Sequence, residues 1–300
     1  FLFEMGGALT CVASLALPQL GDFRVRATDV LLRHRHALAF SNLNPIIESH
    51  TVVAPRMCVE RTAALSDEEY TGLWAAVRDA QALAEASRSV SASNLLLKDG
   101  IAAGSPVPHA HVHIVPRVPG KMEFAWSDLV FELLDEWAPS AKLARAPPVK
   151  LEVPPDGERR DRSEEEMARE AAGYRVLAAE RDPSLIPATW PAHTFFRFPI
   201  KPEQVFASAA DGTVLAFVNL RPLAAGHVLV TPRRIVPRLC DLMREEADQL
   251  WVTVRRVQAL IEAFYGARGC TIGVQDGRDA GQSVPHVHVH VIPVALSKIV

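Results

Sequence analysis

The chain carries one alternating histidine motif twice, at a constant separation. His109, His111 and His113 alternate with apolar residues, and the same pattern returns 177 positions later at residues 286 to 290, since 286 minus 109 gives 177. The same offset needs no gap from residue 42 to residue 113, and it pairs many other residues, among them Asn42 with Asn219, His50 with His227, Trp74 with Trp251, and Gln81 with Gln258. Chance does not hold so many positions in one register, so the sequence predicts two tandem copies of one domain.

The order of apolar patterns within each copy predicts an α+β fold. In the second copy, residues 213–220 and 227–232 are β-rich runs around a turn with Pro and Gly, which indicates a hairpin. A helix follows, with an apolar stripe that Gly266 can terminate, formed by Leu250, Val254, Val257, Ile261 and Phe264. Residues 270–277 and the histidine run, opened by Pro285, return as strands. Strands around one long helix favour an antiparallel sheet.

The segment between the copies differs in composition. Residues 127–137 suggest a short amphipathic helix, residues 146–160 are Pro-rich and predict an extended linker, and residues 162–182 predict a helix. Ser163 and Glu166 form a capping-box pattern at the start of that last helix. We therefore divide the chain into a first domain, a linker and a second domain at residues 1–117, 118–190 and 191–300.

Composition indicates a globular chain without a polyanion-binding surface. Of 300 residues, 49% are hydrophobic, and 32 basic residues are offset by 35 acidic ones, so we expect no nucleic-acid partner. The apolar residues 7–20 are too short for a bilayer and are interrupted by Pro18, so we interpret them as domain core and expect no membrane association. The four cysteines are scattered, which favours a reducing compartment and a cytoplasmic location.

Three alternating imidazoles on a strand share one face, roughly 7 Å apart, while Val287, Val289 and Val291 point to the core. Three roles are compatible with this pattern. The histidines could be satisfied structural residues, or a His-x-His pair could bind zinc with His227 as a further ligand. Alternatively, a neutral imidazole could attack phosphorus while its neighbour donates a proton to the leaving oxygen. The loop at residues 277–284 supports the third role, because its backbone N–H groups and small residues suit phosphate oxygens.

The motif "HVHVHVI" resembles the histidine triad pattern. Residues 195–206, 216–234 and 274–293 are more specifically similar to the fragile histidine triad branch, the diadenosine polyphosphate hydrolases. The third position is His290, where the galactose-1-phosphate uridylyltransferase branch carries Gln, so the resemblance favours hydrolysis over nucleotidyl transfer. Residues 162–177 are similar to the C-terminal tail of the same family. Members of that family are homodimers with a continuous sheet, which implies that this chain is such a dimer fused into an intramolecular pseudo-dimer.

The resemblance implies a role for each residue of the second site. His288 would be the nucleophile on the α-phosphorus, His286 would orient it, His290 would contact phosphate or leaving-group oxygens, and His227 would support the triad. The residues implied to bind substrate are Asn219 at the ribose and, at the phosphates, Gln275, Gly281, Gln282, Ser283 and Val284. No metal ligand is implied, and Mg²⁺ would enter only with the substrate phosphates.

The first copy departs from this pattern. Its counterparts are His111, His109, His113, His50 and Asn42, but Lys98 and Ser105 stand where the second copy has Gln275 and Gln282, and Ser49 replaces Gly226. Lys98 brings a point charge where the family has a neutral amide, and Ser105 is shorter than glutamine. We therefore expect chemistry in the second copy, and the first copy to serve chiefly as its partner.

The resemblance thus implies a hydrolase that splits dinucleoside polyphosphates into AMP and the remaining nucleotide. Two alternatives stay open: a nucleotide-binding signalling module with little turnover, and a nucleoside phosphoramidase. The choice between triphosphate and tetraphosphate substrates also stays open.

Overall fold

The computed structural model describes residues 19–20, 23–105, 107–120, 159–190 and 192–294. The α-helices are α1 (Asp67–Arg88), α3 (Glu164–Arg181) and α4 (Arg244–Tyr265). The strands of the first copy are β1 (Gln19–Leu20), β2 (Phe23–Arg24), β3 (Val30–Arg33), β4 (Ala37–Ser41), β5 (Thr51–Pro55), β6 (Ser93–Asp99) and β7 (Val112–Pro116). The strands that follow are β8 (His193–Phe195), β9 (Phe198–Ile200), β10 (Val205–Ser208), β11 (Val214–Val218), β12 (Val228–Pro232), β13 (Gly269–Asp276) and β14 (Val289–Val294). Short 3-10 turns occur at Ala27–Asp29, Thr62–Ala64, Ile101–Ala103, Pro183–Leu185, Pro202–Gln204, Leu239–Asp241 and Arg278–Ala280.

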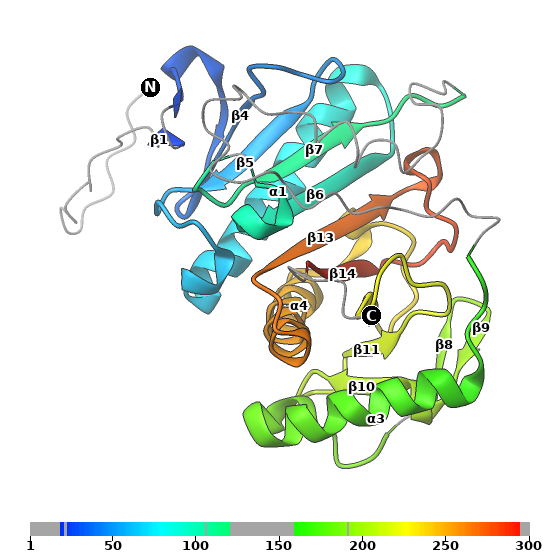
Figure 1. Cartoon of the computed structure of the whole chain (residues 1–300). Helices are drawn as coiled ribbons and strands as arrows, with labels where there is room; N and C mark the ends of the chain where they lie inside the picture. The colour runs from blue at the N-terminus through cyan, green and yellow to red at the C-terminus, as the bar shows by residue number, and fades with distance from the viewer. Residues whose placement is uncertain (1–18, 21–22, 106, 121–158, 191, 295–300) are drawn as a thin grey trace, which may run out of the picture.

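One antiparallel sheet runs through both copies (Figure 1). Its strand order is β10-β11-β12-β14-β13-β6-β7-β5-β4-β3, so each copy contributes five strands and the copies meet where β13 pairs with β6. The pairing runs from Cys270 opposite Asp99 to Asp276 opposite Ser93, and the offset of 177 converts one of these pairs into the other. The two copies are therefore related by a pseudo-two-fold axis, which confirms the α+β fold and the intramolecular pseudo-dimer.

The long helices α1 and α4 pack on one face of this sheet (Figure 1). Apolar residues of alternate strand positions, such as Val53, Ile114, Val230 and Val291, form one buried core with both helices. The two helices meet at the pseudo-two-fold axis, where the Trp74 and Trp251 rings stack with centroids 3.5 Å apart. The opposite face is therefore the one that carries the alternating histidines.

The predicted helix ends are confirmed. Gly266 follows α4 in the left-handed conformation with φ 61°, and its N–H donates to Glu262 O, as the apolar stripe and the glycine predicted. The N-cap Ser163 of α3 accepts from the Glu166 backbone N–H, and the Glu166 side chain accepts from the Ser163 N–H, which completes the capping box. The expected hairpin is β11 paired with β12.

Helix α3 packs against the second copy, on α4, β10 and β11. Tyr174 lies against Phe206 and Phe264, and its hydroxyl donates to the Glu170 carboxylate at 2.5 Å. The helix that resembles a tail of the first copy thus covers the second. The predicted helix at residues 127–137 and the predicted core at residues 7–18 lie outside the described residues, as does most of the predicted extended linker.

The histidine strand begins later than Pro285, which was the expected first residue. β14 starts at Val289, and before it the Val287 N–H donates to Val236 O at 2.7 Å rather than to a ladder partner. The segment that carries His286 and His288 is therefore a strand extension held by loop contacts. Val287, Val289 and Val291 point into the core as predicted.

Candidate active site

Both histidine triads lie on the sheet face opposite the long helices. Paired residues share a face, and the register places them in one row across six strands: Leu229, His290, Gly273, Leu96, His113 and Val52. Three strand spacings separate the third histidines of the two triads, roughly 14 Å. The two candidate sites are thus neighbours on one surface, with the seam between the copies passing between them.

His286 is fully engaged by protein groups. Its Nδ1 lies 3.2 Å from both the backbone nitrogen and the carbonyl oxygen of Val236, and its Nε2 lies 3.0 Å from Thr231 Oγ1. The Thr231 hydroxyl donates to Val287 O at 2.7 Å, so it accepts the proton of His286 Nε2. Both nitrogens of His286 are occupied, and this residue can fix the geometry of the segment but not react.

His288 has the arrangement of a nucleophile. It is 4% exposed, and its Nδ1 donates to His286 O at 2.8 Å, because a carbonyl can only accept. The neutral ring therefore carries its proton on Nδ1 and its lone pair on Nε2. Burial lowers the pKa of His288 below its ordinary value, which keeps the ring neutral near pH 7.

His290 carries its proton on the other ring nitrogen, Nε2, because of its hydrogen bond with the neighbouring imidazole of His227. The Leu223 N–H donates to His227 Nδ1 at 2.9 Å, so the proton of the neutral His227 ring lies on Nε2 and is donated to His290 Nδ1 at 2.9 Å. The proton of His290 is then on Nε2, which has no hydrogen-bond partner among the described residues. Burial lowers the pKa of His227 to about 3 and that of His290 well below 6.5, so both rings are neutral. Neighbouring rings thus present a lone pair at His288 and an N–H donor at His290.

The loop before the triad is braced by Gln282. Its Oε1 accepts from the Gly277 N–H at 3.2 Å, and its Nε2 donates to Pro237 O at 2.9 Å and to His286 O at 3.3 Å. Gly281 has φ 88°, a left-handed conformation that favours glycine. Ser283 is exposed, and Val284 packs beside the apolar cluster described below.

Gln275 and Asn219 border the triad on two sides. Gly273 pairs with His290, so Gln275, two residues along β13, has the same face as the triad and lies beside His288. The Asn219 amide lies 3.2 Å from His227 Nε2, and its Oδ1 accepts from the Arg221 N–H at 3.0 Å. The geometry brings Gln275 beside the nucleophile and Asn219 beside His227.

An apolar cluster adjoins the reacting nitrogen. Phe195, Val205, Leu215, Phe217 and Leu229 form this cluster, and the Phe195 ring stands edge-on to His288 with centroids 5.2 Å apart. Such a wall can take a flat aromatic group beside the triad.

The first copy repeats the framework of the second. His111 Nδ1 donates to His109 O at 2.8 Å, His50 Nε2 lies 3.0 Å from His113 Nδ1, and the Asn42 amide lies 3.2 Å from His50. His111 is neutral as well, because burial lowers its pKa to about 4.

The first copy differs from the second in the surroundings of its triad. Lys98 is 6% exposed on the triad face, where burial lowers its pKa to about 7, and its position along β6 places it beside His111. The Ser105 hydroxyl donates to Val107 O at 2.9 Å and does not brace the loop as Gln282 does. The two triads thus share a backbone geometry and differ in the groups around it.

Sequence reasoning missed the charged groups at the seam. Asp276 is completely buried and accepts from Gln81 Nε2 at 2.6 Å and from the Leu239 N–H at 2.9 Å, and Arg238 lies 2.9 Å from it. Gln81 comes from the first copy, so this network joins the copies directly below the second site. The signal was present, because the repeat offset pairs Asp99 with Asp276 and Gln81 with Gln258, but nothing in the sequence showed that these residues meet.

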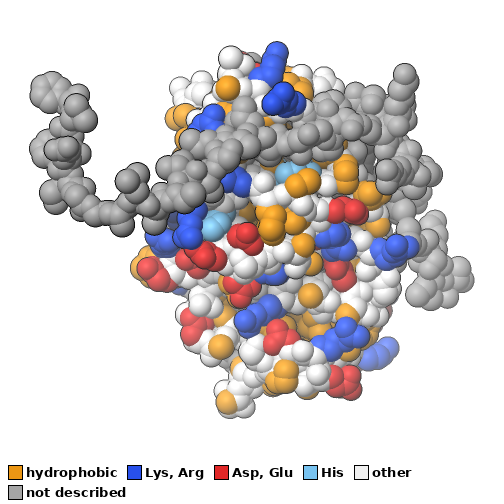
Figure 2. Space-filling view, turned by 90° about the vertical axis from the view of Figure 1, so that its left-hand side faces the viewer, with side chains coloured by type: hydrophobic (Ala, Val, Ile, Leu, Met, Phe, Trp, Pro, Cys, Tyr) orange, Lys and Arg blue, Asp and Glu red, His pale blue; other side chains and the backbone are white. Residues whose placement is uncertain are grey.

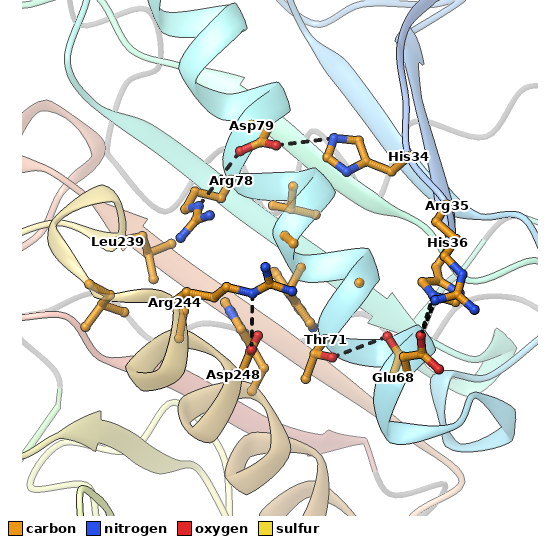
Figure 3. A pocket seen from close by; sticks show the side chains of 17 residues that line it. His34, Arg35, His36, Glu68, Thr71, Arg78, Asp79, Leu239, Arg244 and Asp248 are labelled. Atoms are coloured by element: carbon orange, nitrogen blue, oxygen red, sulfur yellow. Dashed lines mark hydrogen bonds and ion pairs between the residues drawn. The ribbon is translucent and has the colours of Figure 1, made fainter. Parts of the chain in front are cut away.

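A cavity of about 390 Å³ lies on the helical side of the sheet, away from the triads (Figure 3). Figure 3 shows charged side chains around it that pair with one another, as His34 does with Asp79 and Arg244 with Asp248. Its wall includes the stacked Trp74 and Trp251. This cavity therefore belongs to the seam between α1 and α4 and not to the histidine face.

Three further features of the described residues bear on partners. Within them, no three His, Cys, Asp or Glu side chains converge in a way that could hold a metal ion. Basic and acidic side chains are interspersed on the face shown in Figure 2. Of the helices the structure describes, none is long and apolar enough to cross a membrane.

Comparison with known proteins gives a family and several relatives. The family model described as HIT domain matches twice, at residues 24–120 and 201–295. The bifunctional bis(5'-adenosyl)-triphosphatase/adenylylsulfatase of Arabidopsis thaliana is 41% identical over 124 residues, which are 41% of this chain and 68% of that protein. The asymmetrical bis(5'-nucleosyl)-tetraphosphatase of Schizosaccharomyces pombe is 50% identical over 33% of this chain and 53% of its own length. Among solved structures, the C. elegans NitFhit protein is 45% identical, with a TM-score of 0.34 over 35% of this chain and 25% of that one.

Proposed function

The chain belongs to the HIT domain family, and from that premise we propose that its second copy hydrolyses dinucleoside polyphosphates to AMP and the remaining nucleotide. Relatives at 41% and 50% identity carry the names of a bis(5'-adenosyl)-triphosphatase and a bis(5'-nucleosyl)-tetraphosphatase. The chain covers 68% and 53% of these two proteins, and their activities support the proposal.

The observation that carries the proposal is the pair of opposite tautomers in the second triad. His288 keeps a lone pair on Nε2 because its Nδ1–H is committed to His286 O, and His290 keeps a proton on Nε2 because His227 donates to its Nδ1. Covalent catalysis on phosphorus needs both, one group to attack and one to stabilise the departing oxygen. The first triad has the same combination, so the choice of the second copy rests on the groups around its triad.

The reaction then has two displacement steps. In the first, His288 Nε2 forms a bond to the α-phosphorus, the bond from that phosphorus to the bridging oxygen breaks, and His290 Nε2–H donates a hydrogen bond to the departing phosphate. In the second, the oxygen of a water molecule bonds to that phosphorus, the P–N bond breaks with its electron pair returning to His288 Nε2, and a proton of the water passes to solvent as AMP leaves. His286 holds the backbone oxygen that sets the tautomer of His288, so its role is positioning.

Substrate groups are assigned to the residues around the triad. Gln275 and the N–H groups of the loop at residues 281–284 bind phosphate oxygens, Asn219 binds the ribose, and the apolar cluster beside Phe195 takes the base. We propose no tightly bound cofactor, and Mg²⁺ acts only through the substrate phosphates. We place the activity in the cytoplasm, which is supported by Cys58, Cys240 and Cys270 being free thiols.

Product analysis with diadenosine triphosphate and diadenosine tetraphosphate tests this function. We expect AMP with ADP from the first substrate and AMP with ATP from the second. His288→Ala should lower turnover about a thousandfold or more with dinucleotide binding retained, because only the covalent step needs that nitrogen. His111→Ala is the matched control in the first copy, and it should keep most of the wild-type rate.

The alternatives predict other outcomes. Tight dinucleotide binding without turnover would identify a binding module, and a preference for P–N over P–O–P substrates would identify a phosphoramidase. If His288→Ala and His111→Ala each removed about half of the activity, both copies would be active sites. Stoichiometric zinc in the purified protein, with activity lost on its removal, would overturn the nucleophilic role of His288.

A further inference from the structure

The register of the sheet places a residue of the first copy next to the second site. Gln275 of β13 pairs with Asn94 of β6, and His288 precedes β14 at the position that faces Gln275. His288, Gln275 and Asn94 therefore form one row on the triad face. Two strand spacings put Asn94 roughly 10 Å from His288.

Arg117, on the first copy's side of the seam, extends this row. Its N–H donates to Ala92 O at 2.8 Å as β7 leaves the sheet, and side-chain alternation puts Arg117 on the triad face with His113. Its Nη1 donates to Asn94 Oδ1 at 2.8 Å, and Arg117 and Asn94 are 4% and 1% exposed. The Asn94 amide also donates to Ala280 O at 2.9 Å, in the loop that leads to the second triad. Asn94 thus ties the guanidinium of the first copy to the loop of the second.

The opposite side of the seam lacks this arrangement. The offset of 177 maps Asn94 onto Thr271 and Arg117 onto Val294, so the first triad faces a hydroxyl and an apolar side chain at the matching positions. At these matched positions, a positive charge borders the loop of the second site through Asn94, whereas an uncharged valine stands at the counterpart beside the first site. The two copies are unequal in the groups that each lends to the other, as well as in Lys98 and Ser105.

We propose that Arg117 binds the distal phosphates of the substrate held at the second site, with Asn94 positioning its guanidinium. This inference rests on the proposed function of that site. A polyphosphate whose α-phosphorus lies at His288 must lead its remaining phosphates away from the nucleoside pocket, and the row of Gln275, Asn94 and Arg117 leads in that direction along the face. A guanidinium forms paired hydrogen bonds to phosphate oxygens, and it stabilises the charge that grows on the leaving phosphate as the P–O bond breaks.

The test compares a substrate that has distal phosphates with one that lacks them. Diadenosine triphosphate has an α-phosphorus and distal phosphates, whereas the p-nitrophenyl ester of AMP has only the α-phosphorus and an aryl leaving group. Arg117→Val installs the side chain of the matching position, and we expect kcat/KM for diadenosine triphosphate to fall about 100-fold while the ester changes less than about threefold. Arg117→Lys keeps a charge without the planar fork and should lose only about tenfold on the dinucleotide.

Val294→Arg is the control, because it adds the same charge beside the first triad, and it should change neither rate by more than about twofold. Equal loss on both substrates with Arg117→Val would show a merely structural role, and no loss on either would remove Arg117 from the substrate path. Both results overturn the inference. Failure of the proposed function has a different appearance: the wild-type protein would then cleave the ester but neither dinucleotide.

Discussion

Asp99 and Asp276 are pseudo-symmetric carboxylates that hold the two copies together, and replacing each in turn separates stability from activity. Asp99 accepts from Gln258 Nε2 at 2.6 Å and the Thr62 N–H at 2.7 Å and pairs with Arg61 at 3.0 Å. Asp276 has the matching three partners. Breaking a buried ion pair lowers the free energy of unfolding by about 3–5 kcal/mol. Because Glu262 stays beside Arg61 and Glu85 stays beside Arg238, we expect a loss of about 3 kcal/mol in that free energy for Asp99→Asn and for Asp276→Asn.

The two variants should be equal in stability and unequal in turnover. Guanidinium unfolding followed by tryptophan fluorescence measures the first quantity, because the stacked Trp74 and Trp251 lie at the seam. Asp276 adjoins Gln275 and the loop of the second site, so Asp276→Asn should reduce dinucleotide hydrolysis roughly tenfold through misplacement of phosphate ligands. Asp99→Asn should reduce it less than about twofold. Stability losses that differ by more than about 1.5 kcal/mol would refute the pseudo-symmetric account of the seam, and equal activity losses would refute the assignment of chemistry to one side.

Three further perturbations test other parts of the structure. Burial lowers the pKa of His227 to about 3, so below about pH 6.5 the unfolded chain binds a proton at this histidine that the folded chain does not bind. The unfolding free energy should therefore decrease from pH 6.5 towards pH 3, by up to about 1.4 kcal/mol per pH unit for each such histidine. Equal unfolding free energies in urea at pH 7.5 and pH 5 would contradict this. Gly226→Ser places a Cβ against ring atoms at φ 80° and should lower the melting temperature by several degrees, whereas Ser49→Gly at the matching position, with φ 63°, should not lower it. Lys98→Gln with Ser105→Gln, combined with His288→Ala to inactivate the second copy, should raise the residual rate of hydrolysis at least about tenfold. An unchanged rate would show that other residues inactivate the first copy.

The sequence alone predicted those parts of the fold that depend on local patterns. The repeat offset fixed the number of copies, the stripe from Leu250 to Phe264 predicted α4, and Gly266 predicted where it ends. These features are encoded by residues close in sequence, where periodicity and capping have direct physical causes. The alternation of His286 to His290 with valines likewise predicted which side chains face the core.

Features that depend on long-range pairing were not predictable in the same way. The strand start at Val289 depends on the Val236 carbonyl, which captures the Val287 N–H from 51 positions away in sequence, and no local signal marks this contact. The tautomer of His290 depends on Leu223 and His227 together, which only the fold brings into line. Arg117 follows the first histidine run closely in sequence, and its place near the second site follows from strand order alone.

Fusion of the two copies has a physical consequence that a symmetric dimer cannot have. In a homodimer a substitution at the seam enters both sites at once, so a lysine in the place of Gln275 would alter both. In this chain Lys98 and Gln275 are separate positions, and so are Arg117 and Val294. The seam contacts that fix the geometry, Asp99 with Gln258 and Asp276 with Gln81, are matched on both sides. Some groups around the triads are not matched: Lys98 stands where the second copy has Gln275, Ser105 where it has Gln282, and Arg117 where it has Val294. The chain therefore retains symmetry where the sheet must stay continuous, and it differs between copies where substrate would bind, which is the pattern expected if one copy has become a scaffold that supplies residues to the other.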